Sequence, residues 1–243
     1  MTDFNRRVAL VTGGSGGIGA AVCRSLAERG AAVAVAYRSN RQAADDLTQE
    51  LGAHGFTAAA FGADMGDPGA PMALVGEVVE ALGPIDLLVA NHGRARPASY
   101  EDLSADEFDR TLAVNLRSVF LLAQAVLPGM RARRYGRVLL MSSVAAFTGG
   151  VVGPDYAASK AGLHGLVHFL ARRCATDEVT VNALAPALID TPMLPGEASS
   201  LAASIPLGRL GTAEEVAELA VAMLANGYLT NEVVGLDGVM YPR

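Results

Sequence analysis

The chain has 243 residues, of which 51% are hydrophobic and 18% are charged, so it is long and apolar enough to bury one large core. Its formal net charge of -6 argues against nonspecific binding to nucleic acid, which depends on clustered positive charge. The polar segment 1–7 does not resemble a signal peptide, and no run of about 18 apolar residues predicts a membrane span, so we expect a soluble, cytoplasmic protein without a membrane partner.

Short apolar, β-branched runs alternate with longer amphipathic segments along almost the whole chain. This pattern predicts strands at 8–11, 32–37, 57–62, 85–90, 137–141, 179–185 and 233–236, and helices at 17–29, 41–53, 69–82, 104–130, 155–174 and 212–225. Repeated alternation of strand and helix predicts an α/β protein with one doubly wound parallel sheet of about seven strands and helices on both faces. We therefore expect a single domain over residues 1–243.

The exception to the alternation is the segment 187–211, which is rich in Pro, Ser, Gly and Ala. Long irregular segments inside a compact domain are usually lids or binding loops, so we expect a substrate-binding loop here. Met193, Leu194 and Leu201 could line a substrate pocket, or they could be core contacts.

The cysteines and histidines do not predict a disulfide or a metal site. Cys23 and Cys174 lie in apolar helical patterns, which is typical of buried thiols. His164 and His168 are four residues apart on a predicted helix, but no third ligand accompanies them, so helix packing is the better interpretation.

A glycine-rich loop, TGGSGGIG at 12–19, directly follows the first predicted strand and opens the first predicted helix. Glycines allow a tight turn and a close approach of phosphates, while the helix N-terminus offers free N–H groups and the positive end of its dipole. This context predicts a dinucleotide site. The residues expected to contact the cofactor are Gly13, Ser15, Gly17, Ile18 and Gly19.

The end of the second predicted strand favours NADP over NAD. An acidic residue there would bind the ribose hydroxyls of NAD, but this chain has Arg38 and Ser39, which can bind a 2′-phosphate. The alternative is that Arg38 is a solvated loop residue. Asp64 could accept a hydrogen bond from the adenine or could cap the following turn. Asn91 and Gly93 end the fourth strand, where the backbone can line the cofactor.

Tyr156 and Lys160 are four residues apart on a predicted helix and therefore share a face. A nearby ammonium favours the ionised phenol, so we expect Lys160 to lower the pKa of Tyr156. Ser143, from another element, could hold a substrate oxygen beside the phenol. These three side chains predict proton transfer to or from a carbonyl or alcohol.

Together these residues resemble the short-chain dehydrogenase/reductase family, over essentially the whole chain. The motifs that carry the resemblance are TGGSGGIG at 12–19, Asp64, Asn91 with Gly93, Asn115, Ser143, Tyr156 with Lys160, and Pro186 with Thr191. Within the family, the chain is most similar to 3-oxoacyl-[acyl-carrier-protein] reductases in the stretches YRSN at 37–40, SKAG at 159–162, VNALAP at 181–186 and IDTPM at 189–193.

The resemblance implies a role for each matching residue. Tyr156 would be the acid–base group, Ser143 would orient the carbonyl, and Lys160 would also hold the nicotinamide ribose. Asn115 would support a water that relays protons to Lys160. The backbone from Pro186 through Ile189 to Thr191 would hold the nicotinamide carboxamide.

The chain departs from the family pattern at three places. The usual N-N-A-G is Ala90-Asn91-His92-Gly93, so we expect His92 to project polar bulk near the crevice. The usual Pro-Gly is Pro186-Ala187, which reduces backbone freedom. Residues 177 and 178 are acidic where carrier-protein reductases are commonly basic, which weakens docking of an acidic carrier protein. A basic rim could still come from Arg133, Arg134, Arg172 and Arg173.

The leading hypothesis is an NADPH-dependent ketoreductase that reduces a 3-oxoacyl thioester, carried on an acyl carrier protein, with Tyr156 as the proton donor. A second hypothesis keeps the chemistry but takes a free ketone or alcohol as substrate. A third is a nucleotide-binding scaffold without turnover. The resemblance implies a homotetramer or homodimer that uses the apolar faces of 111–127 and 157–170, although packing within one subunit would also explain those faces.

Overall fold

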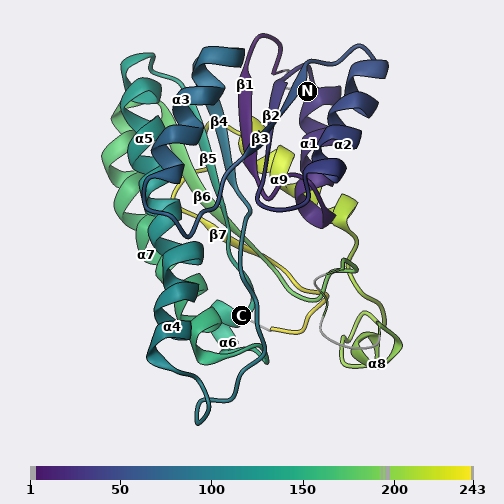
Figure 1. Ribbon diagram of the computed structural model, residues 1–243. Helices are drawn as coiled ribbons and strands as arrows, with labels where there is room; N and C mark the ends of the chain where they lie inside the picture. The colour runs from purple at the N-terminus through teal and green to yellow at the C-terminus, as the bar shows by residue number, and fades with distance from the viewer. Residues whose placement is uncertain (1–3, 193, 195–197, 242–243) are drawn as a thin grey trace.

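Within residues 4–192, 194 and 198–241, which the computed structural model describes, seven strands form one parallel sheet in the order β3-β2-β1-β4-β5-β6-β7 (Figure 1). The strands are β1 (Val8–Thr12), β2 (Ala32–Tyr37), β3 (Ala58–Gly62), β4 (Ile85–Ala90), β5 (Gly136–Met141), β6 (Val179–Pro186) and β7 (Val233–Leu236).

The helices follow the strands in alternation. They are α1 (Gly17–Glu28), α2 (Arg41–Ala53), α3 (Ala70–Leu82), α4 (Ala105–Leu112), the π-helical turn η1 (Ala113–Arg117), α5 (Ser118–Ala132), α6 (Ala145–Thr148), α7 (Pro154–Cys174), the 3-10 turn η2 (Ala175–Asp177), α8 (Ala198–Ala202) and α9 (Ala213–Ala225). Cys23 in α1 and Cys174 in α7 are buried free thiols.

Helices cover both faces of the sheet, and the alternation of side chains along each strand explains why. In β1, Ala9 and Val11 pack with α1, α2 and α9, whereas Val8 and Leu10 pack with α3, α5 and α7. Figure 1 shows these two helical layers on opposite sides of the sheet. A strand that is buried on both faces needs apolar residues at successive positions, which is the pattern of the sequence.

The chain leaves β1 in opposite directions along the sheet. β2 and β3 lie on one side of β1, and β4 to β7 lie on the other. At the carboxyl end of β1, Thr12 pairs with Ala36 of β2 and with Ala90 of β4. A reversal of strand order opens a crevice at this edge, and ligands of open α/β sheets bind there.

The fold class and the type of every predicted element are confirmed, with boundaries that shift by one or two residues, and the structure adds the strand order. Four local features differ from expectation. The long helix predicted at 104–130 contains the π turn η1, and the short helices α6, η2 and α8 were not predicted. A helix of one turn has no periodicity that a sequence pattern can reveal.

One helix of the described residues, Ala105–Ala132, is long and apolar enough to cross a membrane by length and composition alone. This differs from the sequence-based expectation. In the fold the helix packs against α3 and α7 and covers β4 and β5. These are the contacts of a layer helix in an α/β domain.

Candidate active site

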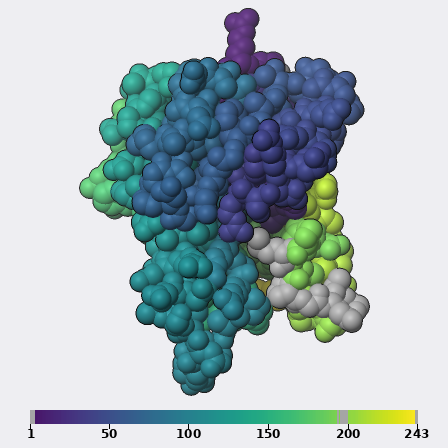
Figure 2. Space-filling model, viewed as in Figure 1, coloured from purple at the N-terminus to yellow at the C-terminus, as the bar shows by residue number. Residues whose placement is uncertain are grey.

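The predicted site residues meet at the edge of the sheet where the strands end. Gly13 follows β1, Asn91 follows β4, Ser143 follows β5, and Pro186 ends β6. Figure 2 shows the region around α4 and the loop before it projecting from the molecule at this edge.

The glycine-rich loop has the shape that a bound pyrophosphate requires. Gly13 and Gly17 have φ values of 62° and 50°, in the left-handed region that favours glycine. A Cβ atom on Gly19 would lie 2.0 Å from Gly13 O, so no larger residue fits there. A Cβ on Gly16 would meet nothing within 4 Å, so the N-terminus of α1 is open. This cradle therefore fits the phosphates of a dinucleotide.

Hydrogen bonds and contacts connect the cradle to the neighbouring strands. Gly14 N donates to Ala36 O at 2.9 Å, and Asn91 Nδ2 donates to Gly13 O at 3.1 Å. A Cβ on Gly17 would lie 3.2 Å from Thr191 Cγ2. The structure thus brings the glycine loop, Asn91 and Thr191 together from three separate parts of the chain.

Arg38 and Ser39 lie exposed at the end of β2, where we expect the adenosine half of the cofactor. The next residue, Asn40, caps α2 by accepting a hydrogen bond from Ala43 N at 3.2 Å. Asp64 accepts from Gly66 N at 2.9 Å, so it does cap its turn. Its contact with an adenine remains a prediction.

Ser143, Tyr156 and Lys160 are assembled from β5 and α7. Ser143 forms a hydrogen bond with Tyr156, and Lys160 Nζ lies 5.8 Å from the centroid of the Tyr156 ring. Val144 N donates to Pro186 O at 3.0 Å, which fixes the turn that carries Ser143 to the end of β6. This arrangement can present two hydroxyl groups to one carbonyl oxygen.

The expectation that Lys160 lowers the pKa of Tyr156 is wrong for this structure. Burial raises the pKa of Tyr156, and the hydrogen bond with Ser143 acts in the opposite direction. Burial also lowers the pKa of Lys160 to about 8, and its Nζ donates to Met141 O at 2.7 Å. The reason is that both groups are desolvated and the lysine is directed to a backbone carbonyl rather than to the phenol oxygen.

Asn115 is fully buried in η1, and its amide clamps the loop after β4. Arg94 N donates to Asn115 Oδ1 at 2.7 Å, and Asn115 Nδ2 donates to Arg94 O at 2.9 Å. The same Nδ2 lies 3.0 Å from Ser159 Oγ, which donates to Tyr156 O at 2.7 Å. Asn115 is therefore connected to the first turn of α7, while its role in a water relay remains a prediction.

Gly93 lies where Asn115 and Lys160 approach each other. A Cβ on Gly93 would be 3.4 Å from Lys160 Nζ and 3.6 Å from Asn115 Oδ1. Ser159 and the carbonyl of Met141 belong to the site but are not among the residues predicted from the sequence. Ser159 could have been found from its place one turn after Tyr156 on the same helix face, whereas nothing in the sequence indicates which carbonyl Lys160 meets.

His92 does not project into the crevice, which corrects the expectation from the sequence. Its Nδ1 lies 2.7 Å from Thr12 Oγ1, and its Nε2 lies 2.7 Å from Ser118 Oγ and 3.0 Å from Val114 O. The ring turns inward because polar groups of β1 and of the α4–η1–α5 helix surround it there. Ala187 has no left-handed φ, so alanine is accommodated at that position.

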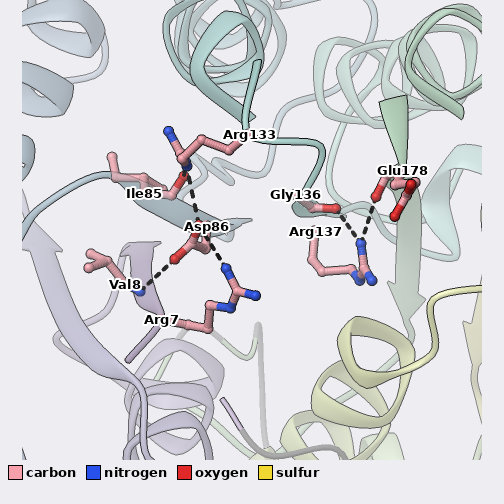
Figure 3. Close-up of polar contacts among 8 residues, drawn as sticks. All are labelled: Arg7, Val8, Ile85, Asp86, Arg133, Gly136, Arg137 and Glu178. Atoms are coloured by element: carbon pink, nitrogen blue, oxygen red, sulfur yellow. Dashed lines mark hydrogen bonds and ion pairs between the residues drawn. The ribbon is translucent and has the colours of Figure 1, made fainter. Parts of the chain in front are cut away.

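The expected basic rim lies at the opposite edge of the sheet, and contacts within the chain engage much of it. Arg133 Nη2 donates to Ile85 O at 2.7 Å and lies 3.4 Å from Asp86 Oδ1 (Figure 3), while Arg134 Nη2 donates to Glu178 Oε1 at 2.8 Å. These residues precede β5, whereas Ser143 follows it. Arg172 and Arg173 lie in the last turn of α7, 16 and 17 residues after Tyr156, which corresponds to about 24 to 26 Å of helix.

Backbone pairing closes the base of the loop 187–211. Asp190 N donates to Gly211 O at 2.9 Å, and Gly211 N donates to Leu188 O at 3.0 Å, around a bridge between Ile189 and Gly211. Leu194 and Leu201 are half-buried, and Met193 lies outside the described residues.

Comparison with known proteins places this geometry in one family. The family model for short chain dehydrogenases matches residues 7–201. The chain is 35% identical to the acetoacetyl-CoA reductase of Allochromatium vinosum, over 97% of this chain and 98% of that protein. It is also 35% identical to the 3-oxoacyl-[acyl-carrier-protein] reductase FabG of Escherichia coli (strain K12), over 98% of this chain and 99% of that protein.

Solved structures agree with these matches. A crystal structure of a blue fluorescent protein from a metagenomic library, in complex with NADPH, has a TM-score of 0.93 at 35% identity and covers 99% of this chain and 100% of its own. A short-chain dehydrogenase/reductase from Serratia marcescens BCRC 10948 has a TM-score of 0.90 at 34% identity and covers 98% of each chain.

Proposed function

Because this chain belongs to the short-chain dehydrogenase family, we propose that it is an NADPH-dependent ketoreductase that reduces the 3-oxo group of an acyl thioester to a hydroxyl group. The observation that carries this proposal is the convergence of Ser143 and Tyr156, joined by a hydrogen bond, beside a glycine cradle that fits a dinucleotide. The relatives named for acetoacetyl-CoA and 3-oxoacyl substrates support the same class of substrate.

Different residues of the chain contribute to different steps of the reaction. NADPH supplies the hydride when it is bound. Ser143 Oγ and the Tyr156 hydroxyl hold the substrate carbonyl oxygen, and Tyr156 donates its proton to that oxygen as the alcohol forms. Because burial raises the pKa of Tyr156, the phenol is protonated at neutral pH, which is the state that a proton donor needs. Positioning both groups before reaction lowers the barrier further.

Lys160 and Asn115 support the action of Ser143 and Tyr156. Lys160 is buried within reach of Gly93, and we propose that its ammonium binds the nicotinamide ribose. Asn115 supports a water that passes protons to Lys160, and the backbone of Pro186, Ile189 and Thr191 binds the carboxamide. The NADPH complex of the blue fluorescent relative supports NADPH as cofactor, and the exposure of Arg38 and Ser39 at the end of β2 supports their binding its 2′-phosphate.

We propose that residues 1–243 act as one catalytic domain, with 187–211 as the substrate-binding segment. The leading substrate is the acyl-carrier-protein thioester, by similarity to the FabG reductases. The acetoacetyl-CoA reductase relative favours a second form, in which coenzyme A carries the same 3-oxoacyl group. The ion pairs that engage Arg133 and Arg134 reduce the charge available for docking an acidic carrier at that edge.

Oxidation of NADPH by the purified protein separates these substrates. The assay compares an acetoacetyl group on an acyl carrier protein, the same group on coenzyme A, and a panel of free ketones, each with NADPH and with NADH. We expect the highest kcat/KM with NADPH and a thioester. Higher values with free ketones would replace the thioester proposal, and binding of NADPH without turnover of any carbonyl would favour the scaffold.

Replacing the proton donor tests the mechanism directly. Tyr156→Phe removes the hydroxyl but keeps the ring, so we expect kcat to fall on the order of 10²- to 10⁴-fold, as for loss of a general acid. NADPH binding, followed by cofactor fluorescence, should persist. Tyr228→Phe is the control because Tyr228 is 99% exposed in the turn between α9 and β7. Unchanged turnover in the Tyr156 variant would contradict the assigned role.

A further inference from the structure

We propose that His92 is a positioning residue for the reaction: it hydrogen-bonds the Val114 carbonyl in the π turn η1 and so holds Asn115 in place against the ends of β1 and β4. The effect on turnover rests on the function proposed above, but the hydrogen-bond network does not. The alanine of the family pattern that the sequence resembles could not form these hydrogen bonds, because its side chain has no polar atom.

The π turn changes which backbone groups pair. In an α-helix the Ser118 N–H would donate to Val114 O, four residues earlier, but here it donates to Ala113 O, five residues earlier. Val114 O instead accepts a hydrogen bond from Ser118 Oγ at 2.5 Å and lies 3.0 Å from His92 Nε2. The histidine thus bonds a carbonyl that the Ser118 N–H does not serve, and without the histidine this carbonyl depends on the Ser118 hydroxyl for its hydrogen bond.

The partners of His92 define its protonation state. Val114 O can only accept a hydrogen bond, and the Ser118 hydroxyl, 2.7 Å from Nε2, already donates its hydrogen to that carbonyl, so Nε2 carries the hydrogen. Nδ1 then accepts from Thr12 Oγ1 at 2.7 Å. Burial lowers the pKa of His92 to about 4, and the charge of Lys160 acts in the same direction, so the ring is neutral at physiological pH. A neutral ring with hydrogen on Nε2 satisfies both sides of the network.

The two ends of this network contact cofactor and active-site segments. Thr12 Oγ1 accepts from Asn91 N at 3.1 Å and from His92 N at 3.4 Å. Asn115 directly follows Val114, and its amide holds the backbone of Arg94 on both sides. His92 therefore connects the end of β1, the loop after β4 and the π turn.

Loss of the histidine contact would favour a return to regular α-helical pairing. A π turn holds one residue more than an α-helical turn. A change from π to α pairing therefore rotates the residues before the turn relative to those after it by roughly 100°. Asn115 would then turn away from Arg94 and Ser159, and the first turn of α7 would lose a hydrogen bond next to Tyr156. Displacement of a reacting group by about 1 Å can cost 10²-fold in rate.

Two substitutions that each reproduce the position of one ring nitrogen of histidine distinguish this role from simple packing. The amide nitrogen of glutamine matches Nε2 in reach, so His92→Gln keeps a donor for Val114 O. The shorter asparagine matches Nδ1 only, so His92→Asn keeps the partner of Thr12 but cannot reach the π turn. His92→Ala restores the usual residue of the family and removes both.

The experiment measures kcat, the KM values for NADPH and thioester, and the midpoint of thermal unfolding for the parent and the three variants. We expect His92→Asn and His92→Ala to lower kcat on the order of 10-fold, and His92→Gln to remain within about 3-fold of the parent. Equal kcat in all folded variants, or loss in the glutamine variant alone, would overturn the proposal. A packing role would lower the unfolding midpoint without this order in kcat.

A second measurement does not depend on turnover. In protein labelled with ¹⁵N, we expect the His92 ring to be neutral with hydrogen on Nε2 down to pH 5. The Asn115 side-chain signals should shift in His92→Asn but not in His92→Gln. A ring that carries hydrogen on Nδ1, or that titrates near its ordinary pKa, would refute the network. If the parent turns over no carbonyl while these signals behave as expected, the proposed function fails and the structural role of His92 stands.

Discussion

At the level of single residues, burial decides which protonation states the active site presents. It raises the pKa of Tyr156 and lowers that of Lys160 to about 8, so each group favours its neutral form more than in water. A neutral phenol suits the donor of a reduction. Arg38 is exposed, which leaves its guanidinium free to meet a phosphate from solvent.

Cofactor choice should depend on Arg38. Arg38→Asp replaces a cation with a carboxylate that repels a 2′-phosphate and can accept from ribose hydroxyls. We expect KM for NADPH to rise by about 10-fold or more and KM for NADH to fall, measured by steady-state kinetics. Arg41→Asp is the control, since Arg41 is an exposed arginine three residues further on. An equal change in both variants would indicate a general charge effect instead.

At the level of elements, helix ends and one irregular turn set the geometry. α9 begins with a capping box in which Thr212 accepts from Glu215 N at 3.1 Å and Glu215 accepts from Thr212 N at 2.9 Å. η1 shows the opposite case, because its regular hydrogen bonding is interrupted where Asn115 must face Arg94. Such interruptions often occur at functional sites.

Removing the cap of α9 should destabilise the protein without affecting chemistry. Thr212→Ala removes the side-chain acceptor, and we expect the free energy of unfolding to fall by about 1 kcal/mol, as measured for other N-caps. Urea unfolding measures the change, with Glu218→Ala as the control because Glu218 is exposed in the middle of the same helix. If Thr212→Ala is as stable as the parent, the capping box does not contribute to the stability of α9.

At the level of the whole molecule, the outer face of the layer formed by α4, η1, α5 and α7 is largely apolar, with Asp109 and Arg117 as charged residues in its groove. A groove there is lined by Leu112, Leu116, Phe120, Gly162 and Leu166, among others. Phe120 is 42% exposed and Phe169, on α7, is 53% exposed. Exposed apolar surface of this kind marks sites of association, and we propose that copies of this chain pack here as a homotetramer or homodimer.

A large side chain in the groove should prevent that association. Gly165 lines the groove, and a Cβ there meets nothing within 4 Å, so Gly165→Arg fits the single chain but obstructs a partner. We expect a smaller species in sedimentation velocity. Gly76→Arg is the matched control because Gly76 lies mid-helix in α3 with the same open space. Unchanged assembly in the Gly165 variant would contradict this interface.

Stability in mild acid should depend on His92, which is only partly exposed. Its pKa is lowered from 6.5 to about 4, so the unfolded chain binds the proton first and stability falls as pH decreases from 6.5 towards 4. Between pH 7 and pH 5 this corresponds to roughly 2 kcal/mol. The charge of Lys160 also acts on His92. The lowered pKa of Lys160 changes stability mainly between pH 10.5 and about 8, which lies above the pH range considered for His92.

Urea unfolding at pH 7, 6 and 5 and at one protein concentration tests this effect. We expect the parent to lose about 2 kcal/mol over this range and His92→Gln to lose less, because glutamine does not titrate. Equal losses in the two proteins would place the acid sensitivity elsewhere.

Local patterns in the sequence were sufficient for much of this protein. The periodicity of apolar residues predicts each long helix and strand, because each element must bury one or both faces. The loop TGGSGGIG and the spacing of Tyr156 and Lys160 are also local, since a turn and one helical face are defined by neighbouring residues. Tyr156 and Lys160 do share one side of α7.

Tertiary packing alone decided the remaining features. His92 points inward, Lys160 meets Met141 O, and the π turn places Asn115 against Arg94, because each depends on groups 19 or more residues away in the chain. Burial, which sets the pKa values of Tyr156 and Lys160, also exists only after the layers have assembled. The direction of a buried polar side chain is chosen by the partners that surround it, and those partners come from other elements.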